Sequence, residues 1–369
     1  MSIRAPADRV VGRLSTLDRF LQIWIVAAMG AGLGLGALVP RLAHALDAVQ
    51  VTHTSLPIAI GLLLMMYPVL ARVRYEELGR LRGSRSMLIS SLVLNWLIGP
   101  ALMFSLAWLL LPHEPAYRTG LIIVGLARCI AMVLIWTELA CADREATALL
   151  VATNSLFQIL AYSFLGYFYI TLLPNWLGLG STSFHIGLWP VARTVLIFLG
   201  IPLAAGYLTR RLGLRVRGRE WYEQAFLPRV GPVALYGLLF TIVVLFALQG
   251  HQITHHPLDV LRIAIPLLIY FAVMFAVSFG WGVALGFGYQ RTATLAFTAA
   301  SNNFELAIAV AIGVFGATSG QALAGVVGPL IEVPVLVGLV YVSLWARRLF
   351  SNGPVTRATV APTIAGDGP

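Results

Sequence analysis

Long, continuously apolar segments recur along the chain, and short polar linkers separate them. Each segment is about 20 residues or longer, enough to cross a hydrocarbon core of about 30 Å as a helix. A β-barrel would instead need short segments of alternating polarity, and these runs do not alternate. The pattern predicts ten membrane-spanning helices: Phe20–Val39, Ser55–Val73, Met87–Leu111, Thr119–Trp136, Ala146–Leu173, His185–Thr209, Val230–Leu248, Val260–Phe287, Ala293–Phe315 and Leu323–Trp345.

The linkers are too short to hold a separate soluble domain. The sequence therefore predicts a cytoplasmic N-terminal arm (residues 1–19), one transmembrane domain (residues 20–350) and a tail (residues 351–369). The tail is polar and rich in Pro and Gly, which is typical of disorder. No apolar core with a cleavage site precedes the first span, so no cleaved signal peptide is expected.

Composition supports a membrane protein and also orients it. The chain is 59% hydrophobic and 11% charged, with a mean hydropathy of +0.86. A net charge of +10 in a soluble protein would suggest a nucleic-acid partner, but here the arginines gather at the ends of the spans. One side of the predicted membrane has 20 of them, and the other has Arg41, Arg118 and Arg262. By the positive-inside rule, both termini are cytoplasmic.

The ten spans divide into two sets of five, residues 20–173 and 185–346, which show weak similarity. Cys129–Val133 aligns with Glu305–Ala309, and Ala148–Gln158 aligns with Ala322–Glu332. Two repeats with an odd number of spans must be inverted relative to each other, as in alternating-access secondary transporters. The alternative is a chance likeness between two helices rich in Leu and Ala.

The fourth and ninth spans both have polar groups near their middle. These are Arg128 and Cys129 in one span and residues 301–305 (SNNFE) in the other. An unbroken helix would place these groups in lipid at a cost of several kcal/mol. An interrupted helix can direct its free backbone and polar side chains into a water-filled cavity. We therefore expect both spans to be interrupted helices that contribute to a substrate and ion site.

Cys129 is a candidate ligand for a thiophilic solute, with Arg128 as a supporting residue. A guanidinium beside the thiol favours the thiolate, which is the form that binds soft metals. Neighbouring residues of a helix diverge by about 100°, so Arg128 need not face the thiol. The alternative is that Cys129 is a small buried hydrophobe.

Two carboxylic acids are candidates for proton coupling. A carboxyl group in a low-dielectric site can change between its protonated and charged forms near neutral pH, and Glu305 is the better candidate. The alternative is a permanent structural ion pair of Glu305 with Arg128 or Arg193. Glu332 lies between two prolines that should kink its span, and a coupling role and a structural role are both open.

Four amides complete the candidate site. Asn302 and Asn303 are candidates to bind the oxygens of a solute, or to bond to exposed backbone. Asn154 and Gln158 are four residues apart and therefore share one helix face. They either line the same cavity or hold helices together.

The remaining candidate ligands are Cys141 and three histidines. With only two cysteines, Cys129 and Cys141, a disulfide framework and a multi-cysteine metal site are excluded, and no cofactor is expected. Cys141, in a short linker, is either incidental or an entry ligand for a thiophilic solute. His251, His255 and His256 have a spacing that could bind a metal, and the alternative is a solvated loop.

Two stretches resemble one transporter family. Gly125–Pro174 contains ARCIAMV and Phe297–Tyr341 contains SNNFELAIAVAI, and both resemble the arsenite efflux permeases of the bile acid/arsenite transporter superfamily. The resemblance covers nearly the whole chain. It implies an inverted-repeat fold in which the interrupted spans four and nine cross. Family members commonly have Trp-Asn-Asp or Trp-Asn-Glu after the first motif; here Thr137 replaces the Asn, so it receives no role.

The resemblance implies that trivalent arsenic is exported across a bacterial inner membrane in exchange for protons, with Cys129 as the thiol and Glu305 as the essential carboxylate. Arsenite is the expected substrate, with antimonite as a further candidate. The nearest alternative is a sodium-coupled symporter of organic anions, which would not need Cys129. A membrane-embedded sensor or enzyme and a passive arsenite channel are further alternatives. No His-Glu-x-x-His, Gly-x-Ser-x-Gly or P-loop motif indicates an enzyme.

Overall fold

The computed structural model describes residues 21–39, 50–51, 54–73, 85–179, 187–255 and 257–351 of the 369-residue chain. This part of the chain is almost entirely helical, as predicted. Its two short strands, β1 (Gln50–Val51) and β2 (Thr54–Ser55), pair antiparallel. The predicted N-terminal arm and residues 352–369 of the predicted tail lie outside the described residues.

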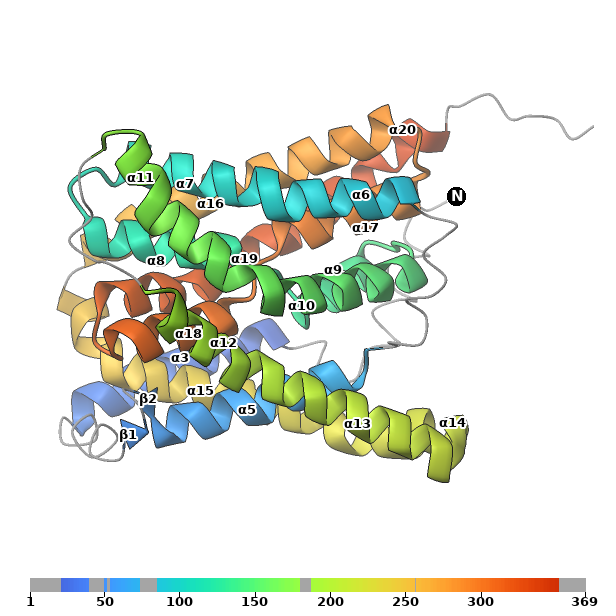
Figure 1. Ribbon diagram of the computed structural model, residues 1–369, viewed down its shortest axis with the longest axis horizontal. Helices are drawn as coiled ribbons and strands as arrows, with labels where there is room; N and C mark the ends of the chain where they lie inside the picture. Colours follow the sequence, from blue (N-terminus) through green and yellow to red (C-terminus); the bar gives the residue numbers. More distant parts are fainter. Residues whose placement is uncertain are drawn as a thin grey trace, which may run out of the picture.

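One group of helices lies along the lower edge of the molecule in Figure 1. It consists of α3 (Leu21–Leu38), α5 (Leu56–Ala71), α13 (Ile201–Val216) and α15 (Leu227–His255). Helix α15 packs on α3 and α5, and α13 packs on α5. Gly32 permits close approach of α3 to α15, because a Cβ there would lie 2.6 Å from the carbonyl oxygen of Val243. We call these four helices the α15 group.

A second group, which we call the crossing group, surrounds the candidate site. It contains α6 to α10 and α16 to α19, with α6, α7 and α16 along the upper edge in Figure 1. The bounds are α6 (Arg85–Val93), η2 (Leu94–Ile98), α7 (Gly99–Leu110), α8 (Pro115–Leu126), α9 (Met132–Leu139), α10 (Arg144–Tyr167), α16 (Pro257–Ala284), α17 (Tyr289–Ala300), α18 (Phe304–Phe315) and α19 (Gly320–Ala346). The remaining elements are η3 (Phe168–Leu172), α11 (Leu173–Trp176), α12 (Leu188–Val195), η4 (Leu196–Gly200), α14 (Gly218–Glu220), η5 (Trp221–Phe226) and α20 (Arg348–Ser351).

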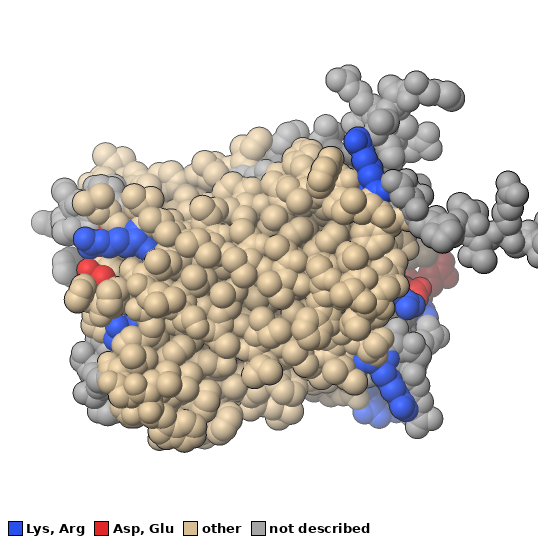
Figure 2. All heavy atoms as spheres, turned by 90° about the horizontal axis from the view of Figure 1, so that it is seen from above, with Lys and Arg blue, Asp and Glu red and all other residues tan. Residues whose placement is uncertain are grey.

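The surface of the molecule is that of a membrane protein. Figure 2 shows charged side chains at the two ends of the face in view, with a broad uncharged surface between them. Large apolar side chains point outward, including Leu109 at 76% exposure and Leu160 at 79%. Contiguous apolar surface of this extent is stable against lipid but not in water.

Six helical stretches in the described chain are long and apolar enough to cross a membrane: Arg85–Leu110, Arg144–Trp176, Leu188–Val216, Gly218–Leu248, Leu258–Ala284 and Gly320–Phe350. Shorter apolar helices run over Ile23–Leu38, Leu56–Ala71 and Phe304–Phe315. The predicted fourth and ninth spans are each divided into two helices. Because 12 residues of α-helix rise only about 18 Å, neither α8 nor α17 crosses a bilayer alone.

Candidate functional site

Two helices are interrupted where the sequence predicted breaks. Helix α8 ends at Leu126 and α9 begins at Met132, while α17 ends at Ala300 and α18 begins at Phe304. The chain becomes extended at the residue after each first helix, with ψ of 116° at Ala127 and 142° at Ser301. The predicted interruption of both spans is therefore confirmed.

The two extended segments meet and pair with each other. Arg128 and Asn302 form an antiparallel β-bridge. The backbone N–H of Asn303 donates to the carbonyl of Ala127 at 3.0 Å, and that of Cys129 donates to Ser301 at 3.4 Å. Backbone groups released by each break are thus satisfied by the other break, which is a requirement inside a membrane. The two interrupted helices meet at this bridge, which we call the crossing.

Side chains from two further helices support the crossing in the same way. The backbone N–H of Arg128 donates to Oε1 of Gln158 on α10, and that of Asn302 donates to Oε1 of Glu332 on α19 at 3.1 Å. Each acceptor lies 30 residues after its donor. The hydrogen bonds therefore make Arg128 equivalent to Asn302, and Cys129 equivalent to Asn303. This pairing differs by two residues from the alignment of Cys129 with Glu305 and has the same offset as the alignment of Ala148–Gln158 with Ala322–Glu332.

The side chains of the bridged pair reach across the crossing. Nη1 of Arg128 donates to the carbonyl of Ala299 at 3.4 Å, in the last turn of α17. Nδ2 of Asn302 donates to Val124 at 2.8 Å and to Ala127 at 3.2 Å, at the end of α8. The final carbonyls of a helix have no partner within the helix. Each residue therefore caps the helix that leads into the opposite break.

Arg128 is fully buried, and its guanidinium does not contact the thiol. Besides Ala299, it donates to the hydroxyl of Tyr270 on α16 at 2.9 Å. Gly99 of α7 makes room for it, since a Cβ there would lie 2.9 Å from Nη1. Within the described chain, neither Arg128 nor Arg193 forms an ion pair with Glu305. Sequence analysis missed Tyr270 and Gly99, because neither has a polar neighbour in sequence that would mark it.

Cys129 and Asn303 take equivalent positions at the start of the second helices. Sγ of Cys129 accepts a hydrogen bond from the N–H of Val133 at 3.3 Å, and Oδ1 of Asn303 accepts one from Leu306 at 3.0 Å. The thiol is 5% exposed. Asn303 therefore bonds to local backbone, as the sequence analysis allowed, and Cys129 lies beside the crossing.

A pocket of about 190 Å³ leads from one end of the molecule to Glu305. Helices α5, α9 and α15 line it, and Glu305 contributes from the first turn of α18. The exposed Arg72 marks the outer end and lies against Gly231, since a Cβ on Gly231 would touch its guanidinium. Glu138 ends the lining on α9. From Ala131 to Glu138, helix α9 rises about 10 Å along the pocket. Glu305 therefore lies at the inner end, between the α15 group and the crossing group.

The other predicted residues lie outside this lining. Oδ1 of Asn154 accepts a hydrogen bond from Nε1 of Trp96 at 3.1 Å, so it links α10 to η2. Glu332 is 4% exposed, and α19 continues without interruption past the prolines at its sides. Cys129, Glu305 and Glu332 are nevertheless within electrostatic range of one another. The structure thus brings the thiol and both carboxylic acids together, with Glu305 facing the pocket.

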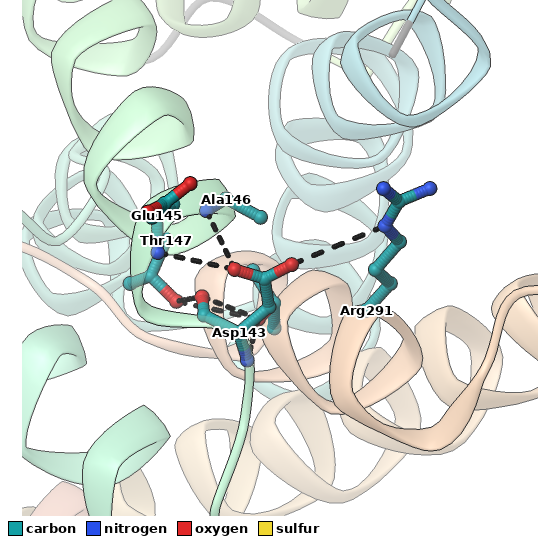
Figure 3. Close-up of polar contacts among 6 residues, drawn as sticks. Asp143, Glu145, Ala146, Thr147 and Arg291 are labelled. Carbon is teal, nitrogen blue, oxygen red and sulfur yellow. Dashed lines mark hydrogen bonds and ion pairs between the residues drawn. The ribbon is translucent and has the colours of Figure 1, made fainter. Parts of the chain in front are cut away.

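Polar contacts join the linker before α10 to the start of α17. Oδ1 of Asp143 accepts hydrogen bonds from the N–H groups of Glu145 and Ala146, which caps α10 (Figure 3). Its Oδ2 lies 3.9 Å from Nε of Arg291 on α17. Thr147 bonds to the carbonyl of Asp143 at 2.7 Å. This junction fixes α10, and with it Gln158, relative to α17.

Cys141 does not line the pocket. Cys141 is partly exposed in the α9–α10 linker, with φ of 54°. Side chains of His251, His255 and His256 lie outside the part of the chain whose side chains are described. Among the described residues, no three His, Cys, Asp or Glu side chains are grouped as a metal site.

Long apolar helices around two broken helices that meet beside carboxylic acids are typical of membrane transporters. The family model described as the sodium bile acid symporter family matches residues 59–256. The chain is 55% identical to the arsenical-resistance protein Acr3 of Corynebacterium glutamicum, over 95% of both chains. It is 33% identical to the Acr3 of Alkaliphilus metalliredigens, over 90% of this chain and 94% of that protein. An uncharacterized transporter of Synechocystis sp. is 36% identical over 98% of this chain and 97% of that protein.

The chain belongs to the arsenical-resistance transporter family within the sodium bile acid symporter family. The resemblance of the two sequence motifs to that family is thereby confirmed.

Proposed function

We propose that the protein exports arsenite from the cytoplasm in exchange for protons. The observation that carries the proposal is the pocket that ends at Glu305, next to the crossing with its buried thiol. Relatives named as arsenical-resistance proteins over nearly their whole length support arsenic as the substrate. Antimonite, which is also trivalent and thiophilic, is a second candidate substrate.

The size of the pocket favours a small solute over the organic anion of the alternative hypothesis. Pockets for drug-sized ligands measure roughly 300–1,000 Å³. At about 190 Å³, this pocket is below that range and suits a solute of a few heavy atoms. Arsenite at neutral pH is mostly the uncharged trihydroxide, which is such a solute.

Topology gives the pocket a direction. We propose ten membrane spans in two inverted repeats, residues 20–173 and 185–346, within one transport domain over residues 20–350. The equivalent hydrogen bonds of Arg128 and Asn302 support the repeat. With both termini cytoplasmic by the positive-inside rule, the end with Arg72 and Arg144 faces the cytoplasm. The pocket then opens to the side from which arsenite is exported.

Glu305 couples the two fluxes in this proposal, with Glu332 as the second acid and Cys129 as the thiol for arsenic. An uncharged solute gains nothing from the membrane potential, whereas one proton moving inward is worth about 2.3 kcal/mol per 100 mV. Cys129 does not line the pocket, so arsenic reaches the thiol only after the start of α9 moves. Asn302, Asn303, Asn154 and Gln158 hold the crossing in place and offer polar atoms to the solute.

Uptake of arsenite into everted bacterial membrane vesicles tests the proposal. Wild type is compared with Glu305→Gln and Cys129→Ser, with and without a protonophore. Glu145→Gln and Cys141→Ser are matched controls, since both lie outside the pocket. We expect uptake that collapses with the protonophore and in both site variants but persists in both controls. Uptake that survives the protonophore contradicts proton exchange, and full uptake by both site variants contradicts the assigned site.

A further inference from the structure

The guanidinium of Arg128 occupies a slot that the fold builds for it. The side chain is fully buried, and three helices form the slot: α7 through Gly99, α16 through Tyr270 and α17 through Ala299. An arginine in a membrane interior is costly unless its surroundings satisfy it. Its position at the carbonyl end of α17 places a positive charge where the helix dipole is negative.

This position matters because the matched family is described as one of sodium symporters, in which a bound sodium ion is expected. In transporters with broken helices, the carbonyl ends of half-helices and the unwound backbone are where sodium binds. Here the carbonyl of Ala299 at the end of α17 already accepts from Arg128. A sodium ion beside the guanidinium would meet a fixed like charge in a low-dielectric surrounding.

The oxygens of both amides of α10 are already engaged in hydrogen bonds. Nε1 of Trp96 can only donate, so it fixes Oδ1 of Asn154 as its acceptor. The backbone N–H of Arg128 fixes Oε1 of Gln158 in the same way. In these three side chains the buried atoms left without partners are donors: Nδ2 of Asn154, Nε2 of Gln158, and Nε and Nη2 of Arg128. The unpartnered oxygens of the crossing, Oγ of Ser301 and Oδ1 of Asn302, belong to the other broken segment. Donors of this kind bind oxygens of water or of a hydroxylated solute, so this half of the crossing does not fit sodium.

We propose that Arg128 is a tethered cation that takes the place of a coupling sodium ion at the end of α17. Arg128 is a positioning residue: its charge stabilises the break between α17 and α18, and through that break it holds Glu305 at the pocket. Coupling is thereby left to proton exchange, so in this respect the inference deepens the proposed function. The charge of Arg128 does not depend on the substrate, so its effect on stability can be measured without arsenite.

The first test measures thermal unfolding of the purified full-length protein in detergent, in NaCl and in KCl of equal concentration. We expect the same Tm for wild type in both salts. A Tm raised by NaCl alone would overturn the inference, because it would reveal a sodium site in the native protein. This comparison needs no variant and stands even if wild-type vesicles take up no arsenite, a result that would refute only the proposed function.

The second test separates the charge from the shape of the side chain. Arg128→Lys keeps the charge, Arg128→Gln keeps a polar chain without it, and Arg193→Gln removes an exposed arginine of α12 as a control. We expect Tm and arsenite uptake to fall most in Arg128→Gln, with uptake lowered about tenfold. Arg128→Lys should recover part of both, and NaCl but not KCl should raise the Tm of Arg128→Gln. Equal Tm values for the Lys and Gln variants in both salts would overturn the inference.

Discussion

Arg128 and Asn302 face each other across the crossing, and the side chain of each hydrogen-bonds the carbonyl end of the helix that leads to the other. Either residue alone would leave one broken helix without its cap. The exchange joins the two breaks into a single unit, because displacement of one segment removes the hydrogen bonds of both. The partners differ in charge, so the two halves of the crossing are related in geometry but not in chemistry.

Removal of the Asn302 cap should destabilise the protein. Asn302→Ala deletes the donor to Val124 and Ala127 and leaves buried carbonyls unpaired, which costs about 1–3 kcal/mol. Thermal unfolding in detergent measures the loss as a lower Tm. Asn175→Ala is the control, because Asn175 is exposed on α11. An unchanged Tm for Asn302→Ala would contradict the capping role.

A methyl group at Gly99 should displace the guanidinium. In Gly99→Ala the new Cβ would lie 2.9 Å from Nη1 of Arg128 and 3.1 Å from the hydroxyl of Tyr270. Overpacking of this kind costs about 1–3 kcal/mol, and we expect both Tm and arsenite uptake to fall. Gly30→Ala is a matched helical control with nothing within 4 Å of its Cβ. Wild-type values for Gly99→Ala would show that Arg128 does not need its slot.

Glu332 should tolerate an amide structurally but not functionally. In Glu332→Gln an oxygen remains to accept from the N–H of Asn302, so we expect a Tm close to wild type. Loss of the ionisable group should nevertheless lower proton-driven uptake about tenfold. Glu332→Ala leaves that buried N–H unpaired. This should lower the free energy of unfolding by about 1–3 kcal/mol and therefore also the Tm. Wild-type uptake by Glu332→Gln would limit Glu332 to a structural role.

The two thiols should react at different rates. Cys141 is partly exposed, whereas Cys129 is 5% exposed and bonded to the start of α9. We expect a membrane-permeant maleimide to label Cys141 quickly and Cys129 slowly, because a buried thiol becomes reactive only when the protein opens. Mass spectrometry of Cys129→Ser and Cys141→Ser separates the two sites. Equal rates would mean that the pocket reaches the thiol without movement of α9.

Filling the pocket should block transport without unfolding the protein. Ala234 lines the pocket on α15, and Ala234→Phe would occupy much of its volume. We expect arsenite uptake to be lost while the Tm stays near wild type, since the new ring enters an existing space. Leu160→Phe places the same ring on an outward position of α10 and serves as control. Unimpaired uptake by Ala234→Phe would exclude this pocket from the transport path.

The sequence pattern was sufficient to locate the breaks, because polar residues in the middle of a span are costly unless they face protein or a water-filled cavity. Arg128-Cys129 and Asn302-Asn303 stood out against apolar surroundings for this reason. The same reasoning failed for Tyr270 and Gly99, which build the slot for Arg128 from helices far away in sequence. The sequence also left open which way the guanidinium of Arg128 points, and it lies against Tyr270 and Ala299.

By itself the sequence determined that the chain is a helical membrane protein, which of its spans are interrupted, and which thiol and carboxylic acids lie near the breaks. Periodicity and the energetics of polar groups in lipid are local properties, so they can be read from neighbouring residues. Tertiary structure alone decided that Arg128 pairs with Asn302, that Glu305 faces the pocket and that Cys129 does not. Those relationships depend on packing between helices more than 100 residues apart, which the local pattern does not encode.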